Sequence, residues 1–177
     1  MRKTPPLTLL TTVLMTAPAV LLAQQADPAD VTTVDGIVAA LYDVISGPAG
    51  QKRDWNRWHS LFLDEAQLIA VGVGRDGETV SYRVLSPQDY VSLSGAYLEE
   101  NGFFEREIHR ETEQFGQIAH LFSTYESRHT AADSTPFQRG INSIQLVNDG
   151  TRWWIATVMW DGERPGNPIP SRYLKEQ

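Results

Sequence analysis

The sequence contains no cysteine among its 177 residues. The fold therefore uses no disulfide bond, and the chain offers neither a thiol nucleophile nor a cysteine for a lipid anchor. Such a chain tolerates an oxidising compartment but gains no stability from it. Stability must come from packing, and the five tryptophans indicate an aromatic core.

The motifs of several enzyme classes are missing too. The sequence has no G-x-S-x-G nucleophile elbow, no H-E-x-x-H metal motif, no P-loop and no dinucleotide-binding glycine fingerprint. Gly72 and Gly74 lie between two expected strands, so they indicate a hairpin and not a phosphate site. We therefore expect no cofactor, and no reaction class follows from the motifs.

Residues 1–23 are built differently from the rest of the chain. Arg2 and Lys3 precede an uncharged, leucine-rich stretch that ends at the small residue Ala23. This order is typical of a cleaved signal peptide. The alternative, an uncleaved membrane anchor, is weakened by threonines and prolines in a stretch that barely reaches the ~20 apolar residues a span needs. We expect a secreted or periplasmic protein.

The charge of the mature chain limits its partners. The whole chain carries 15 basic and 22 acidic residues, a net charge of −7. Without Arg2 and Lys3, 13 basic residues remain and the charge is −9. An acidic surface repels phosphate groups and anionic lipids, so we expect neither a nucleic acid nor, after cleavage, a membrane as partner.

Three helices are expected after a disordered lead over residues 24–31. A capping-box-like Thr32 precedes apolar residues at helical spacing up to Ile45, which predict the first helix. Asp54 caps a second, short helix. The segment Ser86-Pro87-Gln88-Asp89 is a strong start signal for a third, whose inward residues are expected to be Tyr90, Leu93 and Tyr97.

Strands make up the rest of the expected domain, which covers residues 32–161. A hairpin is expected over 67–85, and four long antiparallel strands follow residue 102. Residues 162–177 form an extended tail rich in proline and glycine. Helices gathered at one end of a curved antiparallel sheet define an α+β fold.

Three segments carry a resemblance to a known family. They are the second helix with Trp55 and Trp58, the strand pair around FGQIAHLFSTYESR (115–128), and the closing pair RGINSIQL…DGTRWWIATVMW (139–160). Together with the order of elements, they resemble the nuclear transport factor two-like superfamily, in its SnoaL-like branch. The resemblance implies a cone-shaped fold with a pocket at its open end. It implies no single activity, because the same cone serves isomerases, dehydratases, cyclases and binding domains.

The expected pocket has aromatic walls and a few polar groups from one sheet face, as in a typical small-molecule site. An arginine among aromatic rings would suit an anionic ligand; alternatively, the arginines pair with glutamates across strands. The candidate ligand-binding residues are Trp58, Tyr90, Arg110, Ser123, Tyr125, Arg139 and Asn142.

Two alternatives to a binding domain stay open. The first is a cofactor-independent isomerase, dehydratase or hydrolase that uses a buried His or Asp with Tyr90 or Tyr125 as proton donor. Its candidate bases are His59, Asp89, His109 and His120. The second is a structural or protein-interaction domain whose cone is filled by aromatic side chains.

The strand pairing bears on a possible metal site. If Phe115 and Gly116 form a two-residue turn, Glu111 lies opposite His120 and beside His109. Imidazole and carboxylate groups are suitable metal ligands, but a cross-strand salt bridge is the simpler interpretation, and we expect no metal.

The pair Trp153-Trp154 places one tryptophan on each face of the sheet, because successive strand residues point to opposite sides. A tryptophan on the free face indicates a partner. The resemblance also implies dimerisation through the sheet, so we expect a homodimer.

Overall fold

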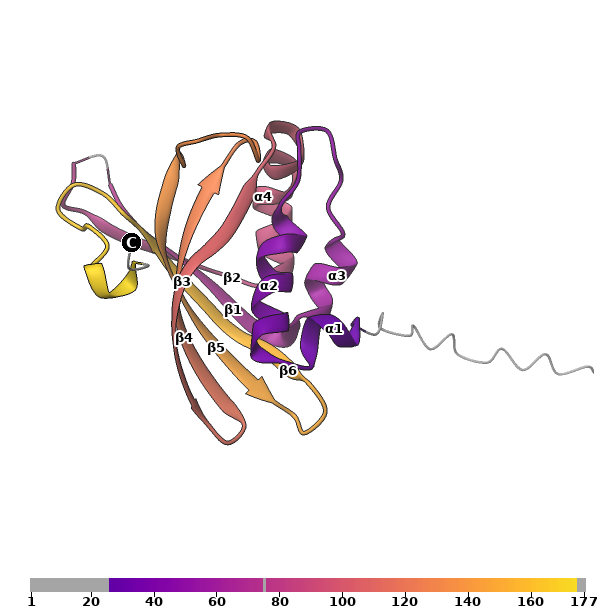
Figure 1. Ribbon diagram of the computed structural model, residues 1–177. Helices are drawn as coiled ribbons and strands as arrows, with labels where there is room; N and C mark the ends of the chain where they lie inside the picture. The colour runs from indigo at the N-terminus through magenta and orange to yellow at the C-terminus, as the bar shows by residue number, and fades with distance from the viewer. Residues whose placement is uncertain (1–25, 75, 175–177) are drawn as a thin grey trace, which may run out of the picture.

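The computed structural model describes residues 26–74 and 76–174. In this described part of the chain, four α-helices lie on one side of a strongly curved sheet and make an α+β domain (Figure 1). The expected signal peptide lies outside the described residues. Within them, no helix has the length and apolar character that crossing a bilayer requires. The helices are α1 (Pro28–Val31), α2 (Val34–Ile45), α3 (Trp55–Ser60) and α4 (Pro87–Asn101).

Side chains cap the start of each helix, where backbone N–H groups have no partner within the helix. The predicted cap Asp54 accepts a hydrogen bond from the N–H of Arg57. At α4, Ser86 and Asp89 form the complete reciprocal capping box. Both sequence signals are confirmed.

The N-terminal lead differs from the expectation. Residues 24–31 were expected to be disordered; of these the structure describes residues 26–31, and there α1 begins after Asp27, whose side chain accepts from the N–H of Ala29. The cap of α2 is Thr33, whose hydroxyl accepts from the N–H of Gly36. The expected cap, Thr32, is one residue too early because it closes α1.

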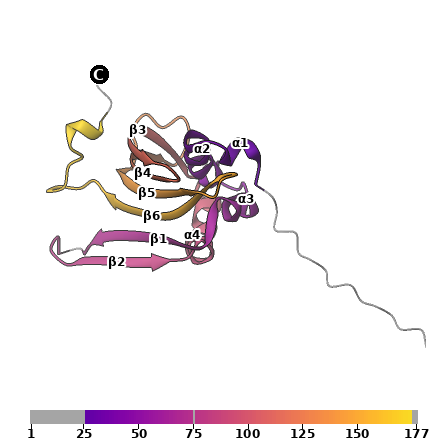
Figure 2. The same cartoon turned by 90° about the horizontal axis from the view of Figure 1, so that it is seen from below.

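Within the described residues, six strands form one sheet in the order β2-β1-β6-β5-β4-β3, which Figure 2 shows from bottom to top. β1 and β6 are parallel and all other neighbours are antiparallel. β1 begins at Phe62, so the chain passes directly from α3 into the sheet. The strands are β1 (Phe62–Val73), β2 (Val80–Leu85), β3 (Phe104–Phe115), β4 (Ile118–Arg128), β5 (Gln138–Asn148) and β6 (Trp153–Gly162).

The pairing of β3 with β4 differs from the expected register. Phe115 pairs with Ile118, so Gly116 and Gln117 form the turn. Gly116 has a φ of 55°, a left-handed conformation that glycine adopts without strain. Glu111 therefore lies opposite Phe122 and not opposite His120.

A β-bulge in β3 decides which side chains face the helices. The register shifts between Glu107 and His109, so Ile108 is the extra residue. Because side chains alternate along a strand, one extra residue moves everything before it to the other face. Glu105 and Glu107 consequently share the concave face with Tyr125 and Ser127, whereas an unbroken alternation along β3 would place Glu107 on the opposite face.

The core lies between the concave face and α2. Trp58 of α3 is also fully buried, as expected. Of the three inward residues expected in α4, Tyr90 packs on Trp58, but Leu93 and Tyr97 are 56% and 51% exposed. α4 buries Gly95 and Leu98 instead.

The C-terminal tail lies on the convex face, away from the helices (Figure 1, yellow). It was expected to be extended, but it contains a short helix at Ser171–Tyr173. The hydroxyl of Thr124 donates to the carbonyl of Tyr173 at 2.6 Å, and the Tyr173 ring lies 5.3 Å from that of Phe122. The tail thus fully buries Thr124 on the outer side of the sheet.

Candidate functional site

A cavity of about 290 Å³ opens between the concave face of the sheet, α2 and α4. Most of its wall is aliphatic or aromatic, and the sheet contributes a few polar groups. The aromatic residues that line it are Tyr42, Trp58, Tyr90, Tyr97, Phe103, Tyr125, Phe137 and Trp160, and the polar ones include Ser94, Glu105, Ser127, Gln138 and Asn142.

Aromatic packing holds one wall of the cavity rigid. The rings of Trp58 and Tyr90 are stacked with centroids 4.8 Å apart, and Trp160 meets Tyr90 edge-on at 6.4 Å. The indole N–H of Trp58 donates to the carbonyl of Pro87 at 3.1 Å, which fixes that ring against α4. A preformed aromatic wall of this kind suits a flat apolar ligand.

Glu105 brings a carboxyl group into the cavity. Its backbone is fixed by Ser46, whose hydroxyl accepts from the N–H of Glu105 at 3.0 Å. The hydroxyl of Ser127 donates to the carboxylate at 2.8 Å. Burial raises the pKa of Glu105 to about 7, although hydrogen bonds from Ser127 and Asn142 oppose the rise. At neutral pH the carboxyl group therefore exists in both protonation states.

Three tyrosines surround this carboxyl group as neutral hydroxyls. Burial raises the pKa of Tyr42, Tyr90 and Tyr125 above the ordinary tyrosine value, and the charge of Glu105 adds to the rise in each case. Of the three, Tyr90 and Tyr125 can use this proton to donate a hydrogen bond to a ligand or to a developing negative charge. The cavity thus combines one titrating acid with neutral donors.

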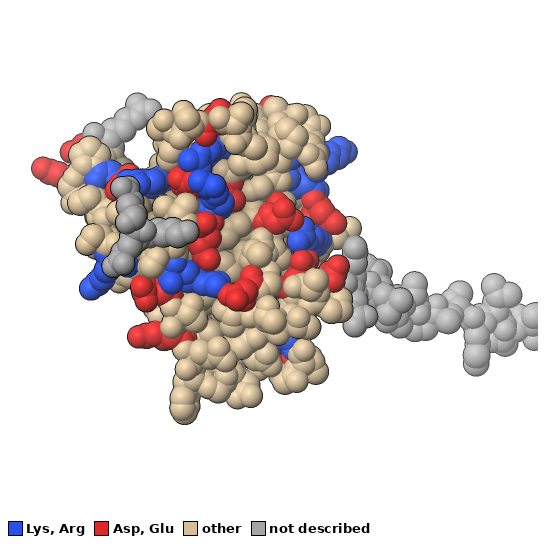
Figure 3. Space-filling model, in the orientation of Figure 1, with Lys and Arg blue, Asp and Glu red and all other residues tan. Residues whose placement is uncertain are grey.

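A second hollow lies on the other side of Glu105. It is an open groove of about 890 Å³ between α2 and β3, and Tyr42 and Glu105 line both the groove and the cavity. In Figure 3, acidic and basic side chains lie next to one another across this face. Arg110 forms ion pairs there with Asp35 and Glu107. The lining of the groove therefore contains side chains of both signs, some of them in ion pairs.

Four of the seven predicted ligand-binding residues line the cavity: Trp58, Tyr90, Tyr125 and Asn142. Ser123 lies behind the wall, fully buried, and Arg110 lies in the groove. Arg139 lies on the convex face and pairs with Glu163 at 2.7 Å. Its side chain points away from Asn142 because the two residues are an odd number of positions apart.

The candidate bases named from the sequence lie elsewhere. Asp89 belongs to the capping box of α4, and His59 lies beside Phe62 near that helix start. His109 and His120 are on the convex face, where His120 bonds the hydroxyl of Ser143. Among the described residues, no His or Asp lines the cavity. Glu105 takes the place expected for such a residue, and sequence alternation missed it because of the bulge.

The expected cross-strand contact between Glu111 and His120 is not formed. Glu111 instead lies 3.0 Å from His109 of the same strand. Within residues 26–74 and 76–174, no group of three or more potential metal-ligating side chains is assembled.

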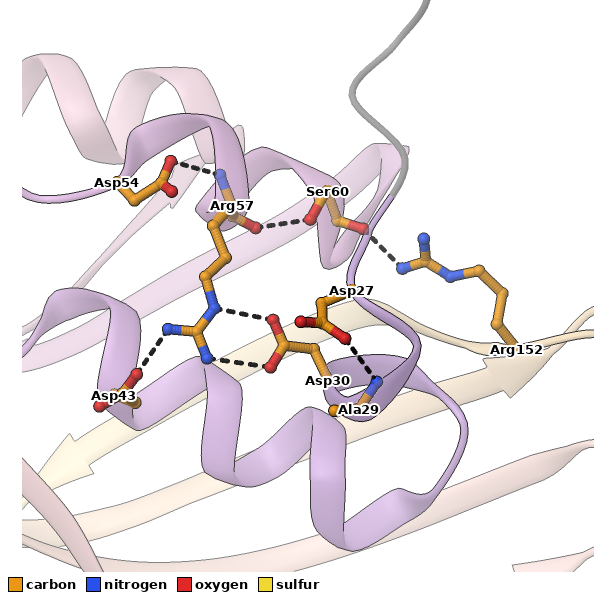
Figure 4. A network of polar contacts seen from close by, with 8 residues as sticks. All are labelled: Asp27, Ala29, Asp30, Asp43, Asp54, Arg57, Ser60 and Arg152. Atoms are coloured by element: carbon orange, nitrogen blue, oxygen red, sulfur yellow. Dashed lines mark hydrogen bonds and ion pairs between the residues drawn. The ribbon is translucent and has the colours of Figure 1, made fainter.

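A separate polar network ties the N-terminal helices together, away from the cavity (Figure 4). The guanidinium of Arg57 in α3 makes two bonds to Asp30 of α1, at 2.7 and 2.9 Å, and one to Asp43 of α2 at 2.5 Å. These carboxylates raise the pKa of Arg57 further above its ordinary value. The network holds α3, and with it Trp58, in place.

No protein-family model and no curated protein matches the chain. Solved structures do match. A nuclear transport factor two-like protein of unknown function from Silicibacter pomeroyi is 14% identical, with a TM-score of 0.50 over 73% of this chain and 92% of that chain. A protein of unknown function with a cystatin-like fold from Nostoc punctiforme is 10% identical, with a TM-score of 0.54 over 78% and 98%. LinA is 7% identical, with a TM-score of 0.50 over 71% and 80%.

These likenesses show that the fold is the nuclear transport factor two-like cone that the sequence predicted. At such identities they show the fold alone. Function has to be argued from the residues of the cavity, because one fold supports many activities.

Proposed function

We propose that this chain binds a small, partly apolar molecule in the cavity and that Glu105 holds the polar group of that molecule. One observation carries the proposal: a carboxyl group with a pKa near 7 lies among aromatic rings. The cavity volume is close to the lower end of the ~300–1,000 Å³ range of ligand sites. A carboxylate repels anions, and Arg110 and Arg139 lie outside the cavity. The proposal therefore favours a neutral or cationic ligand over an anionic one.

Binding of 2-naphthol, followed by quenching of tryptophan fluorescence, tests this proposal. Above pH 7 the ionised Glu105 accepts the O–H of 2-naphthol, and a hydrogen bond to a charged group is stronger than one to a neutral group by about 1 kcal/mol. We expect 2-naphthol to bind about fivefold more tightly at pH 8 than at pH 5.5. Naphthalene, which lacks the hydroxyl, should show no such pH dependence.

The matched variants are Glu105→Gln and Glu113→Gln, because Glu113 is an exposed glutamate of the same strand. The first should abolish the pH dependence and the second should retain it. Equal pH profiles for the protein and for Glu105→Gln would contradict the proposal. If neither probe binds, the cone is filled and the interaction-domain alternative gains.

A second candidate function, abstraction of a proton from carbon, is favoured by the same carboxyl group. A general base works best when its pKa lies near the working pH, and neutral Tyr90 and Tyr125 could stabilise the negative charge that develops. The probe is 5-nitrobenzisoxazole: a base removes its C3 proton, the N–O bond breaks, and a cyanophenolate forms. We expect a rate that rises with pH around 7 and falls about 100-fold or more in Glu105→Gln. Tight 2-naphthol binding without turnover would leave binding as the function.

We also propose a homodimer that pairs through the convex face of the sheet. Support comes from exposed apolar side chains on that face of β2: Val80, Tyr82 and Val84 are 67%, 75% and 50% exposed. The tail covers another part of the same face, so pairing would use the β1–β2 side. Sedimentation at micromolar concentration should give a dimer that Tyr82→Lys dissociates. A monomer would contradict this.

Finally, we propose that the domain works outside the cytoplasm after removal of residues 1–23. The support is the signal-peptide pattern of the sequence. Mass spectrometry of the protein from its native envelope should find an N-terminus at Gln24. A chain that retains Arg2 and Lys3 would argue for the membrane-anchor alternative.

A further inference from the structure

A line of hydrogen bonds runs from the open groove to the cavity. The hydroxyl of Ser123 donates to the carboxylate of Glu107, and the hydroxyls of Ser123 and Tyr42 lie 2.7 Å apart. The amide nitrogen of Asn142 donates to the Tyr42 hydroxyl at 3.0 Å. Asn142 and Glu105 line the same cavity, where hydrogen bonding from Asn142 lowers the pKa of Glu105. We call Glu107, Ser123, Tyr42 and Asn142 the polar chain.

The direction of each hydrogen bond in the polar chain follows from its ends. The carboxylate of Glu107 can only accept, so the proton of Ser123 is used there. Ser123 must then accept from Tyr42, and Tyr42 must accept from Asn142. One proton of the Asn142 amide is thereby committed to Tyr42, which fixes the orientation of the amide and leaves its second proton for Glu105. Each donor in the line has one acceptor, and none is free to turn.

Burial preserves this arrangement. Ser123 is completely buried, and Tyr42 and Asn142 are 5% and 6% exposed, so little water reaches these groups. Hydrogen bonds in such surroundings depend on one another, because an unpaired buried donor or acceptor costs free energy. A change at Glu107 therefore alters the other hydrogen bonds of the polar chain, because solvent does little to compensate for it.

We propose that Glu107, which lies outside the cavity, is a positioning residue for Glu105. It fixes the direction of the polar chain, so that Asn142 always presents an N–H to the Glu105 carboxylate. The inference deepens the proposed function and rests on it for its biological use. The coupling itself, however, exists in the ligand-free protein and can be measured there.

Other groups also face Glu105 and must be separated from this effect. Around the cavity they are Tyr42 of α2, Tyr90 of α4, Tyr125 and Ser127 of β4, and Asn142 of β5. The other charged groups that line the groove are Asp35, Asp43, Arg106, Arg110, Arg128 and Asp133. These charges act on Glu105 through space, whereas the polar chain connects Glu107 to it by hydrogen bonds.

A double-mutant cycle in the full, ligand-free chain distinguishes the two routes. The carboxyl carbon of Glu105 is titrated by NMR in the parent protein, Glu107→Gln, Ser123→Ala and the double variant. Removing the charge of Glu107 acts through space whether residue 123 is serine or alanine. If the polar chain carries the coupling, the effect of Glu107→Gln on the Glu105 pKa differs between the two backgrounds by at least about 0.4, a coupling typical of residues in one network.

Tyr42→Phe gives a second cycle in case Ser123→Ala does not fold, since it keeps the ring and removes the central hydroxyl. Ser127→Ala is the control: it removes a hydrogen bond to Glu105 that does not belong to the polar chain. Its effect should add to that of Glu107→Gln. Additive effects in the Ser123 and Tyr42 cycles would overturn the proposal. Failure of 2-naphthol to bind would instead refute the proposed function and leave the coupling measurable.

Discussion

Replacing Glu105 by glutamine is expected to stabilise the protein above pH 7 and to destabilise it slightly below pH 4.5. The pKa of this carboxyl group rises from 4.5 to about 7 on burial. Between these values the folded chain binds the proton more strongly than the unfolded chain, so the free energy of unfolding falls as pH rises. The loss is complete above pH 7. At 1.36 kcal/mol for each pKa unit, it amounts to about 3 kcal/mol.

Glutamine removes this loss but not without a cost. Its carbonyl oxygen can accept from Ser127 or Asn142, whereas its amide adds donors where the site already supplies donors. We assign about 1 kcal/mol to that mismatch. The variant should thus gain about 2 kcal/mol at pH 8, a rise in melting temperature of about 4–8 °C for a domain of this size. At pH 4 the carboxyl group of Glu105 is protonated and neutral, like the glutamine side chain. The variant is then less stable than the parent protein by the mismatch alone.

The assay is urea unfolding of both proteins at several pH values from 4 to 8.5, followed by tryptophan fluorescence. The difference between the two curves isolates Glu105, since every other titrating group is common to both. Glu113→Gln, at an exposed position of the same strand, should follow the parent within about 0.5 kcal/mol. A difference curve without slope between pH 4.5 and 7 would refute the assignment of a raised pKa to Glu105.

Three further outcomes follow from the contacts. Arg57→Lys should lose about 1–2 kcal/mol in urea unfolding, because lysine cannot make the paired bonds to Asp30; an unchanged midpoint would show that the charge alone suffices. Trp58→Leu should lower the free energy of unfolding by about 3 kcal/mol in the same assay, because the smaller side chain leaves an unfilled space. A loss below about 1 kcal/mol would mean that neighbouring side chains move in and fill that space. A chain ending at Gly166 should bind more anilinonaphthalene sulfonate, since the tail no longer covers Phe122; unchanged dye fluorescence would show that the face stays covered.

The helices α3 and α4 and the position of the closing hairpin along the chain could be predicted because their signals are local, whereas nothing predicted the order of the strands in the sheet or the parallel pairing of β1 with β6. Asp54, Ser86 and Asp89 act on backbone groups within three residues, so their identity and spacing are sufficient. The closing hairpin around Asp149 and Gly150 is equally local. The short α1 was missed because four residues carry too little periodicity to stand out from a polar lead.

The cavity could be predicted in part, and the failure to find Glu105 has a definite physical cause. Trp58, Tyr90, Tyr125 and Asn142 were found because their elements keep a regular period. Glu105 was not, because alternation along β3 is broken at Ile108 and no short motif marks a bulge there. A bulge depends on how the edge of a curved sheet fits over α2, which is a property of the assembled fold.

The position of Glu105 is informative because it is unfavourable. A carboxyl group in an aromatic cavity lowers stability near neutral pH, and an apolar residue there would avoid that loss. The structure nevertheless supports it with donors from Ser127 and Asn142, and the bulge at Ile108 turns it inward. Because the structure supports this destabilising carboxyl group with hydrogen bonds, local stability does not explain why Glu105 is there. A strongly perturbed acid in a cavity is instead typical of a functional site, which is why Glu105 is the first residue to change in any test of what this domain binds.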